Sequence, residues 1–293
     1  MISNNLKNSN AYYGEFEIWN DIYNHNIYTD LAIYGSSRAW VGINPKILED
    51  SLNLSIYNFG MDGHNFGLQY LRHKEYLKHN PPPKFILLAV EFSSLQKRKD
   101  LYLYEQFLPY MLWNQNIKHF TKSYNGFNTL DYHIPLIRYF GKPSVLKKAY
   151  EQIVQNSTHT QYRTNGYKGI DKTWSNDLED AKHKMNTFEI KTDNSTTVLF
   201  ETFLKECHDN AIKVILVYTP EYIEGQKFIK NRQELVNTFV NYAIDYNITL
   251  LDYSKDSICF DKKNFYNATH LNDVGAKLFS KKLAKDLKKL NLR

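Results

Sequence analysis

Residues 31–38 have the sequence LAIYGSSR, and this segment indicates how the chain builds a central sheet. The continuous apolar run Leu31–Tyr34 is typical of a strand buried on both faces, as in a parallel sheet that helices cover on both sides. Gly35, Ser36 and Ser37 follow directly. In open α/β sheets, ligands bind beyond the carboxyl ends of the strands. Ser37 is therefore a candidate functional residue, although Gly-Ser-Ser is also ordinary turn chemistry.

Similar apolar runs recur along the chain, and helical periodicity separates most of them. Further strands are predicted at Leu54–Asn58, Phe85–Val90, Val214–Tyr218 and Thr249–Leu251. Helices are predicted at Lys46–Leu52, Phe66–His79, Phe200–Asn210 and Gln233–Tyr246, and a last helix has Leu278, Leu283, Leu287 and Leu290 on its inner face. Asn44 followed by Pro45 is a helix start. The alternation predicts a single α/β domain over residues 1–293, a doubly wound, flavodoxin-like parallel sheet of about five strands with helices on both faces.

The stretch from residue 97 to residue 195 interrupts this alternation. It follows the third strand, where a connection to the next helix normally takes about 2–6 residues. We therefore predict an aromatic-rich insertion or lid within the domain, with a polar, loop-rich second half from about Asn156 to Asn194. Aromatic residues in a lid can stack on sugar rings or acyl chains, but more often they form the small core of the insertion. The aromatic residues concerned are Tyr102, Tyr104, Phe107, Tyr110, Trp113, Phe120, Tyr124, Phe127, Tyr132, Tyr139 and Phe140.

Composition and charge narrow the class of protein. Hydrophobic residues make up 42% of the 293 residues and charged residues 23%, which is ordinary for a globular protein. Much of the formal net charge of +6 lies in the last helix, where lysines suit the negative end of the helix dipole. No nucleic-acid-binding motif accompanies this charge, so no nucleic-acid partner is predicted. Cys207 and Cys259 belong to no CxxC or Cys/His cluster, so we predict no metal site.

Nothing in the sequence predicts a membrane-spanning segment, because no run of about 18 apolar residues occurs. The N-terminal sequence, MISNNLKNSN over residues 1–10, lacks the apolar core of a signal peptide. These two observations leave the compartment open.

Two further loops have the composition of functional sites. The segment Tyr57–Asn65 contains Gly60 and Gly63, whose spacing lets backbone N–H groups face a small cavity, as an oxyanion hole requires. An ordinary βα turn explains this segment equally well. The segment Phe265–Ala276 presents His270 immediately before an amphipathic helix, with Asn267 three residues earlier and within reach of the ring. This is not a typical position for a core histidine.

Together the three segments resemble the SGNH (GDSL-like) hydrolase and O-acyltransferase superfamily. Gly35-Ser36-Ser37 resembles its Gly-Asp-Ser block, and Asn58 to Gly63 resembles its second block. His270-Leu271-Asn272 with Gly275-Ala276 resembles the last block, Asp-x-x-His-Leu-Asn-x-x-Gly-Ala. The resemblance covers about residues 30–95 and 200–290, and it implies that Ser37 is a nucleophile with His270 as its base. It also implies that backbone N–H groups of Ser37 and Gly63 hold the oxyanion and that the reaction needs no cofactor.

Two positions depart from the family pattern. Asn267 stands where the family has its acid; it can accept a hydrogen bond from the imidazole but cannot stabilise an imidazolium. Candidates to orient the ring instead are Asp252, Asp256 and Asp261. The third block, Gly-x-Asn-Asp in the family, is replaced by Ala89-Val90-Glu91-Phe92-Ser93-Ser94, so Asn65, Ser93 and Ser94 are candidates for the missing oxyanion donor. Arg38 and Glu91 are candidate substrate-binding residues, and Glu91 is equally well explained as a structural carboxylate.

The resemblance implies three functions. The first is a serine esterase that removes acyl groups, acetyl foremost, from a carbohydrate through a Ser–His site. The second is an O-acyltransferase of surface polysaccharide, which needs an acyl donor delivered by a membrane partner. The third is a non-catalytic glycan-binding protein, which the changes at Asn267 and in the third block favour and the retained Ser37 and His270 disfavour. The expected partner is a small acyl ester or a glycan, and envelope-acting relatives favour a periplasmic or cell-surface location in a bacterium.

Overall fold

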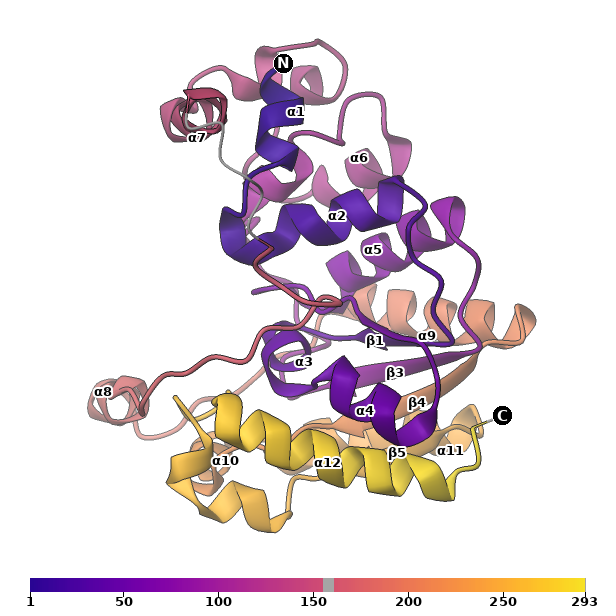
Figure 1. Cartoon of the computed structure of the whole chain (residues 1–293). Coiled ribbons are helices and arrows are strands. Elements are labelled where there is room, and N and C mark those ends of the chain that lie inside the picture. Colours follow the sequence, from indigo (N-terminus) through magenta and orange to yellow (C-terminus); the bar gives the residue numbers. More distant parts are fainter. Residues whose placement is uncertain (155–160, 293) are drawn as a thin grey trace.

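The computed structural model describes residues 1–154 and 161–292, and a parallel five-stranded sheet lies at its centre (Figure 1). The strand order is β2-β1-β3-β4-β5, and every neighbouring pair is parallel. This confirms the predicted α/β fold class and places each strand within two residues of its predicted start. The strands are β1 (Leu31–Tyr34), β2 (Ile56–Asn58), β3 (Phe85–Val90), β4 (Lys213–Tyr218) and β5 (Thr249–Asp252).

Helices cover both faces of this sheet, which explains the continuous apolar runs. Along β3, Phe85, Leu87 and Ala89 point to one hydrophobic cluster. The residues between them, Ile86 and Leu88, point to the other. One face is covered by α3 (Ser37–Gly42), α4 (Pro45–Leu52) and α12 (Asp273–Lys289), and the other by α5 (Phe66–His79), α9 (Asn194–Asp209) and α11 (Arg232–Asp245).

The helix boundaries agree with the local sequence signals, with two corrections. The side chain of Asn44 accepts a hydrogen bond from Lys46 N and begins α4, as predicted. Helix α9 begins at Asn194 rather than at Phe200, because the side chain of Asp193 caps it by accepting the N–H of Thr196. Leu278 of α12 and Leu290, which follows the last residue of that helix, are 49% and 37% exposed and do not belong to the inner face. That face consists of Ala276, Phe279, Leu283 and Leu287.

The strand order reverses between β2-β1 and β3-β4-β5, so the chain leaves β1 and β3 toward opposite sides of the sheet. Such a switch point leaves a crevice at the carboxyl ends of the two strands. Ser37 follows β1 at this point, and the segment from Glu91 to Ser94 follows β3. The fold therefore positions any site at the edge that the sequence predicts.

A cap of short helices lies over α5, on the side away from the sheet (Figure 1). It combines α1 (Ile2–Lys7) and α2 (Glu15–Tyr23), which the sequence analysis did not predict, with α6 (Gln115–Thr121) and α7 (Pro143–Val154) of the predicted insertion. Phe107 and Tyr110 share one hydrophobic cluster with Trp19 of α2 and with the sheet. The cap is therefore continuous with the core of the domain.

The second half of the predicted insertion contains α8 (Asp177–Lys184), and α10 (Ile223–Phe228) follows β4. Residues 155–160, which include the predicted start of the polar half at Asn156, lie outside the described residues. Among the described helices, none combines the length and the apolar character needed to cross a membrane.

Candidate active site

Ser37 lies at the first position of α3, immediately beyond β1. Gly35 has a φ of +147°, and a Cβ at this position would meet the side chains of Ala39 and Ala89 at 2.8 and 2.9 Å. Only glycine fits such a turn. Ser36 then caps α3, since its Oγ accepts the N–H of Arg38 at 3.2 Å. The Gly-Ser pair thus directs the chain sharply from strand to helix and leaves Ser37 at the edge of the sheet.

His270 meets Ser37 from the opposite end of the chain. Its Nε2 lies 2.7 Å from Ser37 Oγ. The loop that carries it is closed on itself, because Tyr266 N donates to His270 O at 3.1 Å and the Tyr266 ring stacks on the imidazole with centroids 5.2 Å apart. Asn272 then caps α12 through Gly275 N. The structure therefore brings the two residues that the sequence analysis paired into direct hydrogen-bonding contact.

Asn267 fixes the orientation of the imidazole. Its Oδ1 accepts the backbone N–H groups of His270 at 2.9 Å and of Thr269 at 3.1 Å. Because two N–H donors require an oxygen, the amide cannot be turned the other way. His270 Nδ1 lies 3.0 Å from the same oxygen and must carry the proton. The lone pair of His270 is then on Nε2, facing Ser37, which is the tautomer that a general base needs.

The charge environment of His270 differs from that of a triad. Burial lowers the pKa of His270 to about 3, and the cation of Arg38 acts in the same direction. The imidazole is therefore neutral at physiological pH. Thr269 Oγ1, 2.9 Å from Nδ1, is a second side-chain contact there. The three aspartates considered as substitute acids hold turns instead: Asp252 accepts Ser254 N, Asp256 accepts Ile258 N, and Asp261 accepts Lys263 N.

Gly63 lies in the same cavity wall as Ser37 and His270. It has a φ of +67°, and the ring of Tyr102 packs where a Cβ would project, so both backbone and space require glycine. Asp62 N already donates to Glu15 Oε1 at 3.0 Å. The next N–H along this loop, that of Gly63, is therefore the candidate oxyanion donor. Asn65, in contrast, donates its side-chain N–H to Ser93 O at 2.6 Å. Neither Asn65 nor Ser93 is among the residues that line the cavity.

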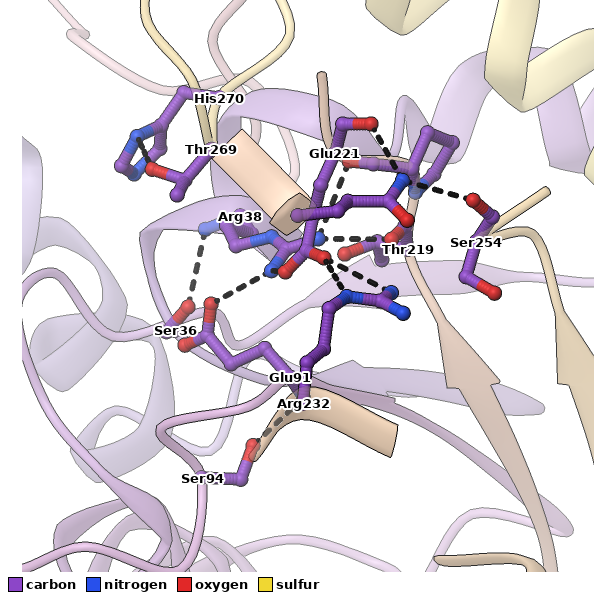
Figure 2. Close-up of polar contacts among 12 residues, drawn as sticks. Ser36, Arg38, Glu91, Ser94, Thr219, Glu221, Arg232, Ser254, Thr269 and His270 are labelled. Carbon is purple, nitrogen blue, oxygen red and sulfur yellow. Dashed lines mark hydrogen bonds and ion pairs between the residues drawn. The ribbon is translucent and has the colours of Figure 1, made fainter. Parts of the chain in front are cut away.

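Arg38 and Glu91 form a network beneath the site (Figure 2). The side chain of Arg38 is only 4% exposed. It donates to Glu221 at 2.5 Å, to Glu91 at 3.2 Å and to the carbonyl of Thr219 at 2.8 Å. These contacts join the carboxyl ends of β1, β3 and β4. The structure thus places both predicted substrate-binding residues in an ion-pair network that supports the site, outside the cavity lining.

The cavity that contains Ser37 and His270 has a volume of about 300 Å³ and is rich in aromatic rings. Its walls come from the N-terminal segment, α3, the loop after β2, the insertion and the loop before α12. Besides Ser37, Gly63 and His270, it is lined by Tyr13, Trp40, Asp62, Arg98, Tyr102, Tyr162, Ile170, Lys172 and Tyr266.

Several residues of this environment were missed by the sequence analysis. Glu15, Arg72 and Arg163 form a fully buried charged cluster beside the loop after β2, and Glu221 is buried between Arg38 and Arg232. Charged residues are normally solvent-exposed, so nothing in their sequence context distinguishes them from surface residues. Their pairing depends on segments far apart in the chain.

Comparisons with known proteins find similar chains among solved structures. No protein-family model matches the chain, and no curated protein matches it. Among solved structures, the chain is similar to the acetyl xylan esterase AlAXEase at 13% identity and a TM-score of 0.43, over 89% of this chain and 98% of that one. It is also similar to a GDSL-like lipase from Bacteroides thetaiotaomicron VPI-5482 at 12% identity and a TM-score of 0.39, over 88% of each chain.

Proposed function

We propose that the protein is a serine esterase that cleaves small O-acyl esters, with Ser37 as nucleophile and His270 as general base. The observation that carries this proposal is the 2.7 Å contact between Ser37 Oγ and His270 Nε2, together with the tautomer that Asn267 imposes on the ring. A neutral imidazole with its lone pair aimed at a serine hydroxyl is the arrangement that activates a nucleophile.

The steps follow from this geometry. Ser37 Oγ attacks the ester carbonyl carbon while its proton moves to His270 Nε2. The carbonyl oxygen becomes an oxyanion, which the N–H groups of Ser37 and Gly63 stabilise. The C–O bond to the alcohol breaks, and His270 returns the proton to the leaving oxygen. A water molecule then attacks the acyl carbon while His270 takes its proton. The bond between the acyl carbon and Ser37 Oγ breaks, His270 passes the proton to Ser37 Oγ, and a carboxylic acid is released.

The cavity supports a sugar as the alcohol part of the ester. Aromatic faces pack against the apolar faces of sugar rings, and Tyr13, Trp40 and Tyr162 line the cavity beside Ser37. Asp62 offers a carboxylate to sugar hydroxyls, with Trp40 Nε1 donating to its Oδ1 at 3.1 Å. A volume of about 300 Å³ is at the low end for small-molecule sites, which favours a short acyl group such as acetyl.

Turnover of p-nitrophenyl acetate and of acetylated xylan tests the proposal. Ser37→Ala and His270→Ala should each abolish most of the turnover without loss of fold. Ser36→Ala is the matched control: it removes the neighbouring hydroxyl, which caps α3, so it should cost about 1 kcal/mol of stability and retain turnover. Unchanged activity in Ser37→Ala would exclude this nucleophile. Adding an acceptor sugar to the same assay separates hydrolysis from acyl transfer.

A glycan-binding role without catalysis is the second candidate, and one observation favours it. Asn267 supplies no negative charge to His270, while Arg38 supplies a positive one, so the imidazolium formed during catalysis is poorly stabilised. A protein of this kind binds acetylated oligosaccharides equally well in wild-type and Ser37→Ala forms and shows no Ser37-dependent turnover. Calorimetric titration with acetylated xylo-oligosaccharides, run beside the turnover assay, decides between the two candidates.

A further inference from the structure

The second half of the insertion runs along the rim of the candidate active site. Residues 161–175, which we call the arm, form hydrogen bonds with three separate parts of the site. They therefore join three elements: β2, which precedes the oxyanion loop (residues 59–63); α3, which carries Ser37; and the segment that carries His270. The backbone contacts are Asn58 N to Asn165 O at 3.0 Å, Lys168 N to Trp40 O at 3.2 Å, Asp273 N to Ile170 O at 3.0 Å and Ser175 N to Tyr266 O at 2.8 Å.

Arg163 is the residue of the arm whose side chain ties the cavity walls together. Its Nη1 donates to the carbonyl of Gly60 in the oxyanion loop at 2.9 Å. Its Nε donates to the carbonyl of Tyr13 at 2.6 Å, and its guanidinium lies 4.1 Å from the ring centre of Trp40. Tyr13, with a φ of 56°, is in the left-handed region, which costs energy for a tyrosine and needs such an anchor. One side chain thus holds three elements of the cavity wall together.

The charge of Arg163 is matched inside the protein. Glu15 pairs with Arg163 at 2.7 Å and with Arg72, and all three side chains are at most 1% exposed. Burial alone would raise the pKa of Glu15, but the two guanidiniums outweigh it and lower that pKa to about 2. Removing one partner from such a buried cluster is strongly destabilising. If the arm moved away from the cavity, Arg163 would have to leave Glu15, so the arm is a fixed wall.

The cluster of Glu15, Arg72 and Arg163 contacts the oxyanion loop directly. Arg72 and Arg163 both donate to Gly60 O, at 3.3 and 2.9 Å, and Glu15 accepts Asp62 N at 3.0 Å. The peptide groups on either side of Met61 are therefore held by charged partners, and the orientation of the following N–H, that of Gly63, depends on them.

We propose that Arg163 is a positioning residue that holds the oxyanion loop in its catalytic orientation, and that the arm is a permanent wall of the active site. Of the two interpretations of residues 97–195, an insertion or a lid, this proposal favours a fixed insertion. The inference rests on the proposed function, because it assigns a role in oxyanion stabilisation. It also predicts a property of the resting protein, namely the rigidity of residues 59–63, which can be measured without turnover.

The test compares Arg163→Met with Arg138→Met. Arg138 is also a buried arginine of the insertion, and it donates to Leu108 O and Ser3 Oγ in the cap, away from the cavity walls. For p-nitrophenyl acetate, Arg163→Met should lower kcat by about 10- to 100-fold with little change in KM, since an oxyanion contact is made mainly in the transition state. Arg138→Met should leave both constants near the wild-type values, although both variants lose thermal stability.

Amide hydrogen exchange provides the second readout, at a temperature where circular dichroism shows both variants folded. Exchange in residues 59–63 should be faster in Arg163→Met and unchanged in Arg138→Met. Arg163→Lys keeps the charge opposite Glu15 but loses the forked contacts, so it should fall between wild type and Arg163→Met in both readouts. Equal kcat and equal exchange in the Arg163→Met and Arg138→Met variants would overturn the inference. If the wild type shows no Ser37-dependent turnover, the proposed function fails, and the exchange comparison still decides whether Arg163 holds the loop.

Discussion

The amide oxygen of Asn267 accepts hydrogen bonds from both the ring and the backbone of His270, at 3.0 Å from Nδ1 and 2.9 Å from N. In a serine protease, replacing the triad aspartate by asparagine costs about 10⁴ in rate because the histidine adopts the wrong tautomer. Here the backbone donors hold the oxygen toward the ring, so this tautomer penalty is absent. Relative to a triad, the site lacks only the negative charge.

Asn267→Asp should therefore increase activity. The carboxylate would accept the same hydrogen bonds and stabilise the imidazolium, raising the pKa of His270. A gain in kcat of about tenfold is expected, well below 10⁴, because the tautomer is already correct. Steady-state kinetics with p-nitrophenyl acetate measure the gain. A matched change, Asn272→Asp at the cap of α12, places a carboxylate nearby without contacting the ring and should leave kcat unchanged.

The pH dependence is set by the same pKa. The pKa of His270 is lowered to about 3, so the ring stays neutral and kcat/KM should be flat between about pH 5 and pH 8. In Asn267→Asp the acid limb should move up into this range. The stability of the fold should also depend on pH. In the unfolded chain His270 binds a proton below its usual pKa of 6.5, whereas in the folded chain it does so only near pH 3. The free energy of unfolding therefore falls as pH falls through this window, opposite to the effect of a salt-bridged histidine. A wild-type rate that drops with a midpoint near pH 6.5 would contradict a histidine that stays neutral in this range.

Arg38 should act on stability more than on substrate affinity. Arg38→Met leaves Glu221 and Glu91 without their main partner and should cost about 3–5 kcal/mol in urea unfolding. Arg232→Met removes only the second contact of Glu221, at 3.1 Å, and should cost less. The double variant Arg38→Met/Glu221→Gln should recover part of the loss. A raised KM with unchanged stability in Arg38→Met would instead support the substrate-binding role expected from the sequence.

A substitution of Tyr13 tests the proposal that the cavity binds a sugar. The ring of Tyr13 stacks on Trp40 with centroids 6.5 Å apart, and the half-exposed side chain lines the cavity. Tyr13→Ala should raise KM for acetylated xylan by up to about tenfold, the size of a typical aromatic contact, while leaving p-nitrophenyl acetate unaffected. Tyr28→Ala, at an exposed tyrosine outside the cavity lining, is the control and should change neither. Equal effects on both substrates would show that Tyr13 does not contact the sugar.

The sheet is predictable because its signals are local, whereas the pairing of Ser37 with His270 is predicted by the resemblance of their sequence blocks to the SGNH family. Leu31–Tyr34 and Phe85–Val90 are apolar throughout, since helices cover both faces. Gly35 is the residue type that the turn after β1 requires, and Asn44 and Asn272 are typical N-cap residues of α4 and α12. The periodicity of the last helix gave two wrong positions, because Leu278 and Leu290 are apolar but exposed.

The cap and the arm are not predictable in this way. Helices α1 and α2 have few local sequence signals. Phe16 and Trp19 of α2 belong to one hydrophobic cluster with Phe107 and Tyr110 of the insertion, and this long-range packing is not visible in the sequence. Arg163 has no distinctive neighbours in sequence, and its partner Glu15 lies in a different segment. Such long-range polar pairings leave no periodic trace, so the walls of the cavity emerge only from the three-dimensional structure.

The most direct test of the central claim is detection of an acyl-enzyme. The protein is mixed with p-nitrophenyl acetate, quenched with acid within the first turnover, and analysed by intact-protein and peptide mass spectrometry. We expect the added mass of one acetyl group on Ser37. This adduct should be absent in Ser37→Ala, and more abundant in Asn267→Asp if acylation is the slower step. Turnover with no acetyl group on Ser37, or an adduct that persists in Ser37→Ala, would contradict the central claim.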